Sequence, residues 1–314
     1  MSTILCINPW IYDFAAYNTW ISPLGLLKIA AVLRKAGHNV SLLDCLDRHH
    51  PAAPAPRSRR DAYGCGQFAK VELPKPPVLA HIPRSWGRYG LPVSVFEAEL
   101  RARPRPDALL VTSMMTYWYP GVFEVIRRVK TCWPGVPVAL GGVYATLCAD
   151  HARAYSGADV VLTGPGEQPV LRWLDDLTGS SGAEWVSAAE DICPAHDLRR
   201  PQGYVALQTA RGCPFACPYC AVQQLAPRFV PRSPERVVQE ICWCVESLGA
   251  EDIVFYDDAL LVNAGQHIHP ILDQVIAHQL PVRFHTPNGL HARFIDLPLA
   301  RKMRRAGFVT IRLG

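Results

Sequence analysis

Residues 204–220 read Tyr-Val-Ala-Leu-Gln-Thr-Ala-Arg-Gly-Cys-Pro-Phe-Ala-Cys-Pro-Tyr-Cys. The apolar run Val205–Thr209 predicts a buried strand, and Gly212 permits a tight turn out of it. The loop that follows carries Cys213, Cys217 and Cys220. Three thiols so spaced can face a single metal centre, and thiolate is the ligand that iron–sulfur clusters require. We therefore expect these three cysteines to hold an iron–sulfur cluster, with one iron left open for another ligand.

Two simpler interpretations of the cysteine loop stay open. A zinc site would need a fourth Cys or His nearby, and the cysteines could also be buried free thiols. Cys242 and Cys244 are two positions apart on a predicted helix, so their side chains do not face each other. Neither of them is an obvious fourth ligand for a zinc ion bound to the loop.

Working outward toward the C-terminus, strands and helices alternate. A helix after Ser233-Pro234 begins a run of further strands and helices, which we expect at Glu235–Leu248, Ile253–Tyr256, His267–His278, Val282–Thr286, Leu297–Ala306 and Val309–Leu313. Four strand–helix units in about 110 residues are half of what an eight-unit barrel of roughly 250 residues needs. The sequence thus predicts a partial (β/α) TIM-type barrel over 204–314, and we expect a chain cut at Gly314 to aggregate or to bind its ligand poorly.

Toward the N-terminus, the chain alternates in the same way. Continuous apolar runs predict five parallel strands at Thr3–Asn8, Val40–Asp44, Ala108–Ser113, Val138–Leu140 and Val160–Thr163. Helical patterns at Leu24–Ala36, Gly121–Trp133 and Pro169–Leu177 separate or follow them. Such a pattern favours a flavodoxin-like (Rossmann-like) α/β sheet covered on both faces. We expect this domain over 1–182, with a linker over 183–203 that follows Gly179–Gly182.

A basic, proline-rich insertion interrupts this first domain at about 47–107. Residues 51–106 hold ten Lys or Arg against four Asp or Glu, a balance of +6 within a chain of net charge +5. A basic stretch can contact nucleic acid, but the rest of the chain has no basic stripe. We therefore interpret it as an ordered excursion with a solvated face and expect no nucleic acid partner.

Length and composition exclude several classes of protein. The chain has 314 residues, of which 49% are apolar and 19% charged, so it can bury sizeable cores and is not disordered or a disulfide miniprotein. There is no run of roughly 18 apolar residues and no basic signal-peptide start. We expect a cytoplasmic protein without a membrane span, whose 11 cysteines are reduced or metal-bound.

The cysteine motif with its lead-in Thr209-Ala210-Arg211-Gly212 resembles the radical S-adenosylmethionine (radical SAM) superfamily. The resemblance implies that Cys213, Cys217 and Cys220 hold a 4Fe–4S cluster and that SAM chelates the open iron. It also implies a SAM site lined by Tyr219 before the last cysteine, by the acidic pair Asp257 and Asp258 after the second barrel strand, and by Asn288 after the third. Asp can also end a strand in an ordinary turn, and Asn-Gly is a common turn pair.

A five-stranded parallel sheet before such a barrel resembles the branch of the superfamily with an N-terminal cobalamin-binding domain. The segments Leu140–Thr146 and Thr163–Glu167, with Asn8-Pro9, are similar to that branch. Open α/β sheets bind ligands at the carboxyl ends of their strands. The resemblance implies that cobalamin is a cofactor and that it contacts the residues that lie there: Asn8, Ser113, Gly141, Gly142, Thr146, Gly164 and Glu167.

One departure concerns the cobalt ligand. Many cobalamin domains carry Asp-x-His-x-x-Gly after the first strand, but here that loop is Pro9-Trp10-Ile11-Tyr12-Asp13 and has no His. The similar spacing in Asp47–Ala52 follows the second strand and is interpreted as coincidence. Cobalamin, if bound, is expected without histidine on cobalt. The aromatic segment Met114–Tyr119 would form a wall of the cobalamin pocket or pack under the barrel.

The resemblance implies reductive cleavage of SAM to a 5′-deoxyadenosyl radical and, with cobalamin, methylation of an unactivated carbon. Alternatives are a radical SAM enzyme that closes or rearranges a ring, with a structural first domain, and an iron–sulfur electron-transfer module. A pure electron carrier has no need of Asp257, Asp258 and Asn288 around an open iron. The expected partners are a small-molecule or natural-product substrate and an electron donor such as flavodoxin or ferredoxin.

Overall fold

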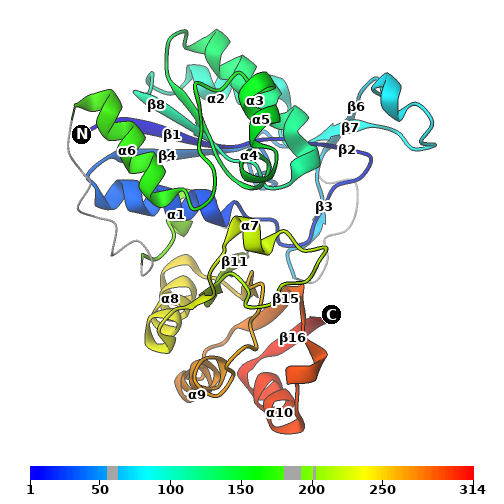
Figure 1. Cartoon of the computed structure of the whole chain (residues 1–314), viewed down its shortest axis with the longest axis vertical. Coiled ribbons are helices and arrows are strands. Elements are labelled where there is room, and N and C mark those ends of the chain that lie inside the picture. The colour runs from blue at the N-terminus through cyan, green and yellow to red at the C-terminus, as the bar shows by residue number, and fades with distance from the viewer. Residues whose placement is uncertain (55–62, 180–191, 201–202) are drawn as a thin grey trace. The chain divides into compact units, whose positions relative to one another are not determined.

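The computed structural model describes residues 1–314 apart from 55–62, 180–191 and 201–202 (Figure 1). Its described residues form two compact units. The first comprises Met1–Asn18, Gly25–Asp61 and Cys65–Arg200, and the second comprises Thr19–Leu24, Ala62–Gly64 and Pro201–Gly314. Most of the linker expected over 183–203 lies outside the described residues.

The first unit is built on a five-stranded parallel sheet, as the apolar runs predicted. Its strands are β1 (Thr3–Asn8), β4 (Asn39–Asp44), β8 (Ala108–Val111), β9 (Val138–Leu140) and β10 (Val160–Val161), in the order β10-β9-β8-β1-β4. This is the flavodoxin-like order, in which the direction of winding reverses beside β1. The predicted fold class is confirmed for this unit.

Helices cover both faces of this sheet because its strands are apolar on both sides. On one face, Ile4, Cys6 and Leu110 pack with α1 (Leu24–Lys35) and α6 (Glu167–Thr178). On the other, Leu5 and Ile7 pack with helices α2, α3, α4 and α5 (Figure 1), which span Val93–Arg101, Tyr119–Cys132, Val143–Leu147 and Ala149–Tyr155.

The proline-rich insertion and the loop after β1 together form small sheets that the sequence did not predict. Strands β2 (Ile11–Asp13), β7 (Gly87–Tyr89) and β6 (Lys70–Glu72) form an antiparallel sheet, and β3 (Tyr17–Asn18) pairs with β5 (Gly66–Gln67). The loop after β1 therefore becomes a strand of the insertion's own sheet. Among the described residues of the first unit, short 3₁₀ turns lie at Pro77–Leu79, Thr116–Trp118 and His196–Leu198.

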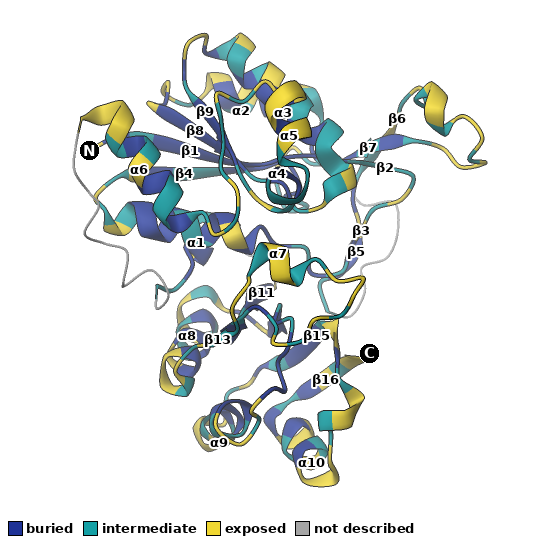
Figure 2. Ribbon diagram, viewed as in Figure 1, coloured by how far each residue is buried: buried dark blue, intermediate teal, exposed yellow. Residues whose placement is uncertain are grey.

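The second unit contains four parallel strands in sequential order, β11-β14-β15-β16, as expected of the first part of a β/α barrel. They span Tyr204–Leu207, Asp252–Phe255, Arg283–Leu290 and Phe308–Leu313. Helices α8 (Pro234–Leu248), α9 (Ile268–His278) and α10 (Leu297–Ala306) pack on one face of this sheet, where strands and facing helix sides are buried (Figure 2). The remaining elements are β12 (Ala210–Arg211), α7 (Val222–Leu225), β13 (Val230–Pro231) and a 3₁₀ turn at Ala292–Phe294.

Local signals account for the helix ends in this unit. The Ser233 hydroxyl caps α8 by accepting from the Arg236 amide, with Pro234 in the first turn, and Gly249 ends the helix with a positive φ of 63°. Asp296 caps α10 in the same way, through the Leu299 amide at 2.8 Å. After each of these two helices the chain soon enters the next strand of the sheet, β14 after α8 and β16 after α10.

Strand β15 is longer than predicted and includes the Asn288-Gly289 pair. Gly289 is paired with Arg312 and Leu290 with Leu313 of β16, with register shifts before them. The turn interpretation of Asn-Gly is therefore wrong here, because pairing with a neighbouring strand outweighs the local preference of the dipeptide. No helix among the described residues has the length and apolar character needed to cross a membrane.

Candidate functional site

The cysteine loop leaves the carboxyl end of β11 and returns through a short ribbon. Arg211 of β12 pairs with Val230 of β13, so residues 212–229 form a loop closed at its base. Gly212 has a φ of +76°, and a Cβ there would lie 2.4 Å from the carbonyl oxygen of Arg228. Only glycine fits this crossing, which agrees with the turn predicted at that position.

The thiols themselves lie at and near the surface of the loop. Cys213 and Cys217 are partly buried and Cys220 is exposed. The Gln223 amide on α7 donates to the carbonyl oxygens of Cys213 at 2.8 Å and Phe215 at 3.1 Å, which fixes the backbone beside the first thiol. Burial raises the pKa of the Cys213 thiol, and the nearby Asp258, Cys217 and Cys220 raise it further.

This donor set fits an iron–sulfur cluster. Three thiols near a carboxylate repel one another as anions, so a cationic centre is needed to hold them together as thiolates. Among the described residues, the sulfur atoms of Cys213, Cys217 and Cys220 do not all lie within 4.8 Å of one another. The loop thiols are therefore more widely spaced than ligands of a single zinc ion at about 2.3 Å would be.

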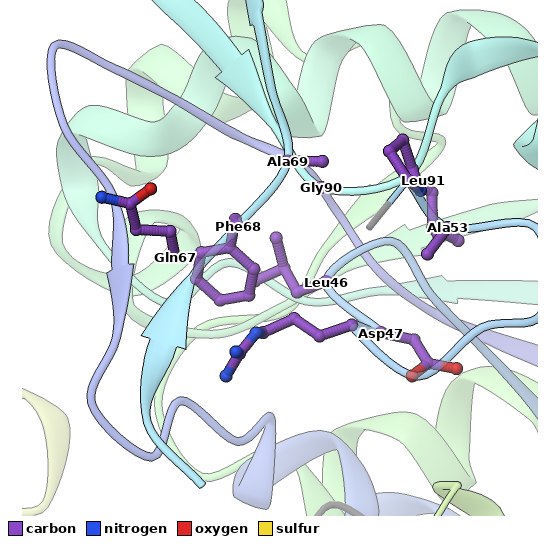
Figure 3. Close-up of a pocket in the computed structure, with 10 residues that line it drawn as sticks. Leu46, Asp47, Ala53, Gln67, Phe68, Ala69, Gly90 and Leu91 are labelled. Carbon is purple, nitrogen blue, oxygen red and sulfur yellow. The ribbon is translucent and has the colours of Figure 1, made fainter. Parts of the chain in front are cut away.

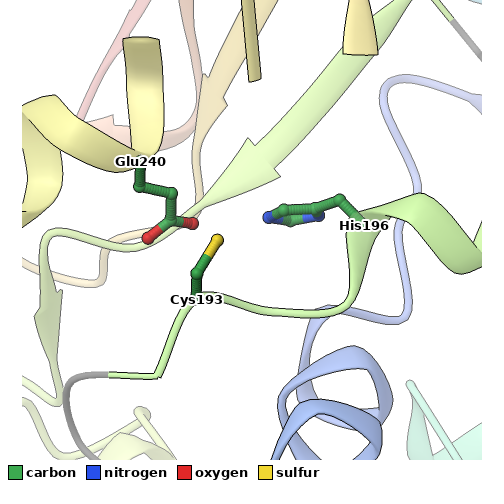
Figure 4. Close-up of side chains that lie close together, drawn as sticks. All are labelled: Cys193, His196 and Glu240. Atoms are coloured by element: carbon green, nitrogen blue, oxygen red, sulfur yellow. The ribbon is translucent and has the colours of Figure 1, made fainter. Parts of the chain in front are cut away.

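Glu240, drawn in Figure 4, is a side chain of α8 in the second unit. Within its own unit Glu240 forms an ion pair with Arg232 at 2.6 Å, with both side chains nearly buried.

Asp257 anchors the start of the cysteine loop. Its carboxylate accepts hydrogen bonds from the Ala210 amide at 2.7 Å, the Thr209 amide at 3.0 Å and the Thr209 hydroxyl at 2.7 Å. Asp257 is 4% exposed. The side chain expected at the SAM site thus points into the protein and bonds the backbone that leads to the cysteines.

Two residues complete this anchor. His267, which precedes α9, lies with its Nε2 2.8 Å from the Thr209 hydroxyl. The Arg232 amide donates to the Thr209 carbonyl at 2.9 Å, and its guanidinium donates to the Gln208 carbonyl at 2.8 Å. Burial, and next the positive charge of Arg232, lower the pKa of His267, so its imidazole is neutral near pH 7.

The other residues predicted for SAM take different positions. Asp258 is partly buried, and burial raises the pKa of its carboxyl. The Asn288 amide donates to the carbonyl oxygens of Tyr256 and Asp257 at 3.2 Å each, so it joins the ends of β14 and β15. Tyr219 is 92% exposed. The structure therefore brings Asp258 near Cys213 and Asn288 near Asp257, while Tyr219 projects from the loop.

At the carboxyl edge of the first sheet, predicted residues bond one another. The Ser113 hydroxyl donates to the Gly141 carbonyl at 2.7 Å and accepts from the Ala145 amide at 3.3 Å. The Thr146 hydroxyl accepts from the Gly164 amide at 3.0 Å. These bonds tie the loops after β8, β9 and β10 together, so both hydroxyls shape the edge.

Gly142 lets two of these loops approach closely. It has a φ of +95°, and a Cβ there would lie 2.4 Å from the carbonyl oxygen and 2.8 Å from the amide nitrogen of Ser113. Any side chain would force the loops apart. Backbone thus lines this part of the edge, as a site for a large flat ligand requires.

The other predicted cobalamin residues lie at neighbouring strand and helix ends. The Asn8 amide donates to Asp44 at 2.7 Å, and Asn8 is buried at the end of β1. Glu167 opens α6 after Gly166 and is also buried. Trp118 in the aromatic segment donates from its indole to Asp13 at 3.0 Å.

The loop after β1 contains Trp10, whose side chain points into the protein. This side chain is 1% exposed and donates from its indole to the Leu91 carbonyl at 2.7 Å. A Cβ on Gly121 would lie 1.9 Å from the Trp10 carbonyl oxygen, so α3 and this loop are in direct backbone contact. The loop Pro9–Asp13 thus holds a buried tryptophan and contains no histidine.

A pocket also lies beyond the end of β4 (Figure 3), with Leu46, Asp47, Phe68 and Leu91 among its lining residues. No residue predicted for cobalamin lines it.

Sequence reasoning missed several residues of the cysteine-loop anchor: His267, Arg232 and Gln223. Thr209 belongs to the lead-in of the cysteine motif, but the motif alone does not indicate its hydrogen bonds. No local signal could have found His267, because it reaches Thr209 only through the fold, across 58 positions of sequence.

One protein family and several curated proteins are similar to parts of this chain. Residues 89–173 match the B12 binding domain family. The anaerobic magnesium-protoporphyrin IX monomethyl ester cyclase of Cereibacter sphaeroides is 23% identical over 69% of this chain and 41% of its own length. An uncharacterized methyltransferase of Synechocystis sp. (strain PCC 6803) is 30% identical over 57% of this chain and 35% of its own.

Among solved structures, the radical S-adenosylmethionine methyltransferase TsrM from Kitasatospora setae has a similar fold. The structure of TsrM with tryptophan and a SAM analogue gives a TM-score of 0.68 at 15% identity, covering 100% of this chain and 59% of TsrM. Another TsrM structure holds cobalamin and a [4Fe–4S] cluster. The chain thus spans about half the length of the relatives that it resembles.

Proposed function

Because the chain is similar to radical SAM proteins with a B12-binding domain, as its sequence indicated, we propose that it is part of a cobalamin-dependent radical SAM enzyme. The observation that carries the proposal is the braced loop of three cysteines at the carboxyl end of the first barrel strand. When bound, a 4Fe–4S cluster would supply the electron that cleaves SAM to a 5′-deoxyadenosyl radical, and cobalamin would supply a methyl group for an unactivated carbon.

In this proposal the thiolates of Cys213, Cys217 and Cys220 hold the cluster and leave one iron open. Asp258, near Cys213, and Asn288, at the end of β15, lie at the edge where SAM would bind. Asp257 acts indirectly, because its carboxylate is already bonded to Thr209 and Ala210. Tyr219 is exposed and free to lie against the adenine of SAM.

We place cobalamin at the carboxyl edge of the first sheet, where winding reverses beside β1. Gly141 and Gly142 offer backbone rather than side chains to the ligand, and Ser113 and Thr146 hold that backbone in place. Asn8, Gly164 and Glu167 lie at the neighbouring ends of the sheet. The loop after β1 contains no histidine, and its Trp10 is buried. We therefore propose that no histidine binds cobalt.

A second candidate reaction is ring closure. The magnesium-protoporphyrin ester cyclase of Synechocystis sp. (strain PCC 6803) is 23% identical over 94% of this chain and 56% of its own length. That match extends across both units, so a cyclase-type reaction on a small molecule is the alternative to methyl transfer. An electron-transfer module fits less well, because it needs no polar groups around an open iron.

The test is anaerobic reconstitution of the protein, with iron, sulfide and corrinoid measured beside SAM cleavage by a reductant, or by flavodoxin or ferredoxin as proposed donors. We expect about four irons and four sulfides per chain, and a corrinoid whose Co(II) electron paramagnetic resonance lacks splitting from an axial nitrogen. Replacing all three loop cysteines by Ala should abolish the cluster. A triple variant that keeps four irons and four sulfides would refute the cluster assignment, and absence of any bound corrinoid would refute the cobalamin assignment.

A further inference from the structure

Three buried polar side chains meet at the carboxyl edge of the second unit's sheet. Thr209 follows β11, Asp257 follows β14 and His267 precedes α9; they are 0%, 4% and 3% exposed. None of them is one of the three loop thiols. Burying three such groups is costly unless each is fully hydrogen-bonded, so their arrangement calls for a physical explanation.

The protons that each group carries determine which group donates in the hydrogen bonds among Asp257, Thr209 and His267. An ionised Asp257 accepts only, and the Thr209 hydroxyl at 2.7 Å has one proton to donate to it. That hydroxyl can then only accept from His267, whose Nε2 lies 2.8 Å away. His267 must therefore carry its proton on Nε2. The order of donation runs from His267 to Thr209 to Asp257.

We propose that His267, Thr209 and Asp257 form a chain of positioning residues that fixes the backbone entering the cysteine loop and thereby sets the position of Cys213. The inference rests on the proposed function for its relevance to a cluster. Its physical content concerns the protein alone, because every bond in the chain joins residues of one unit.

The backbone from Thr209 to Cys213 has little freedom to move. Asp257 holds the amides of both Thr209 and Ala210, and Ala210 and Arg211 are paired with β13. Gly212 is then pressed against the Arg228 carbonyl. Since each residue between the anchor and the thiol is held by a bond or a close contact, loss of the Thr209 hydroxyl should loosen Cys213 before it affects Cys220.

The test uses paired substitutions. Thr209→Val removes the hydroxyl at nearly constant volume and Thr209→Ser keeps it; His267→Leu removes the donor, whereas the amide of His267→Gln can still donate. Thr310→Val is the matched control, because the Thr310 hydroxyl also bonds a buried histidine, His285, at 2.8 Å, but on β16, which does not carry the cysteine loop.

The first readout is alkylation of the iron-free, reduced protein, followed residue by residue by mass spectrometry. We expect Thr209→Val and His267→Leu to raise the labelling rate of Cys213 at least threefold and to leave that of the exposed Cys220 unchanged. Thr209→Ser, His267→Gln and Thr310→Val should stay within twofold of the parent protein. An unchanged Cys213 rate in Thr209→Val, or an equal rise in Thr310→Val, would overturn the inference.

The second readout is the release of iron to a chelator after reconstitution, which should be several-fold faster in the two disruptive variants alone. Failure of the parent protein to take up a cluster would contradict the proposed function and not this inference, which the labelling rates decide. Equal iron release from Thr209→Val and the parent would count against the positioning role even if both proteins load fully.

Discussion

At the residue scale, Gly142 is a position in the first unit where adding one carbon atom would disturb two loops. Its φ of +95° and the 2.4 Å approach to the Ser113 carbonyl oxygen mean that Gly142→Ala must strain the backbone and separate two loops. We expect a loss of about 2–4 kcal/mol in unfolding free energy, measured by urea denaturation, together with weaker corrinoid binding.

Gly164→Ala is the matched control for this prediction. Gly164 also has a positive φ, +70°, but a Cβ there would meet nothing within 4 Å. Only the backbone preference is lost, which costs about 1 kcal/mol. Equal losses in the two variants would show that the contact with Ser113 does not matter.

The buried His267 makes the stability of the folded protein depend on pH, and the direction of that dependence can be worked out. Burial and the charge of Arg232 lower the pKa of His267 in the folded state, so below its unfolded value of about 6.5 the unfolded chain binds a proton that the folded chain does not. Its contribution to stability is therefore present above that pH and is lost as the pH falls.

Hydrogen exchange of the β11 and α9 peptides can measure this contribution. Between pH 7.5 and pH 5.5 the parent protein should lose more protection than His267→Gln does, by up to about 1.4 kcal/mol per pH unit. His38, whose pKa burial also lowers, is present in both proteins and cancels. Identical pH dependence in both proteins would show that His267 is not held neutral.

At the scale of elements, α8 is joined to the base of the cysteine loop by the buried Glu240–Arg232 pair. Their side chains are 2% and 10% exposed and 2.6 Å apart. Glu240→Ala would leave the guanidinium buried without its carboxylate, which costs about 3–5 kcal/mol. Asp273→Ala, which breaks the surface pair with Lys302, should cost less than about 1 kcal/mol; both losses can be measured by urea unfolding, and similar losses would contradict this account.

The elements also show which parts of the fold the sequence can predict. Runs such as Thr3–Asn8 and Ala108–Val111 are apolar throughout because both faces of the sheet are covered, and this signal is local. Strand β2 in the loop after β1, and strands β6 and β7 in the insertion, have three residues each, too few to show a sequence pattern, so their pairing alone defines them. The extension of β15 through Asn288 likewise depends on β16, which no local pattern reveals.

For the candidate site, the sequence indicates the proposed cluster ligands but does not indicate the residues that hold their loop in place. Cys213, Cys217 and Cys220 are recognisable because their ligand chemistry is contained in eight consecutive positions. The sequence predicts that Asp257 lies at the SAM site, and in the structure its carboxylate accepts a hydrogen bond from the loop's own backbone. The roles of His267 and Arg232 arise only when strands distant in sequence come together.

At the scale of the whole molecule, the second unit is not one continuous segment of chain. It includes Thr19–Leu24, in which Trp20 lies with its ring centroid 4.5 Å from that of His285. The Ser22 amide donates to the Tyr256 hydroxyl at 2.9 Å, and the Tyr204 hydroxyl donates to the Ile21 carbonyl at 2.8 Å. A stretch near the N-terminus thus packs against three strands of the second unit.

A fragment of residues 201–314 would lose these contacts, although it holds every strand of the second unit's parallel sheet. Its Tyr204 and Tyr256 hydroxyls would lose their backbone partners, and the buried His285 would lose the ring that covers it; each lost buried bond costs about 1–3 kcal/mol. We therefore expect the fragment to show markedly faster hydrogen exchange in β11, β14 and β15 than the 314-residue chain. Trp20→Ala in the intact chain should reproduce part of this loss, because it removes the ring and leaves the backbone bonds. Equal protection in fragment and chain would mean that residues 19–24 contribute no stability to the sheet, and that the strands from Tyr204 onward fold without them.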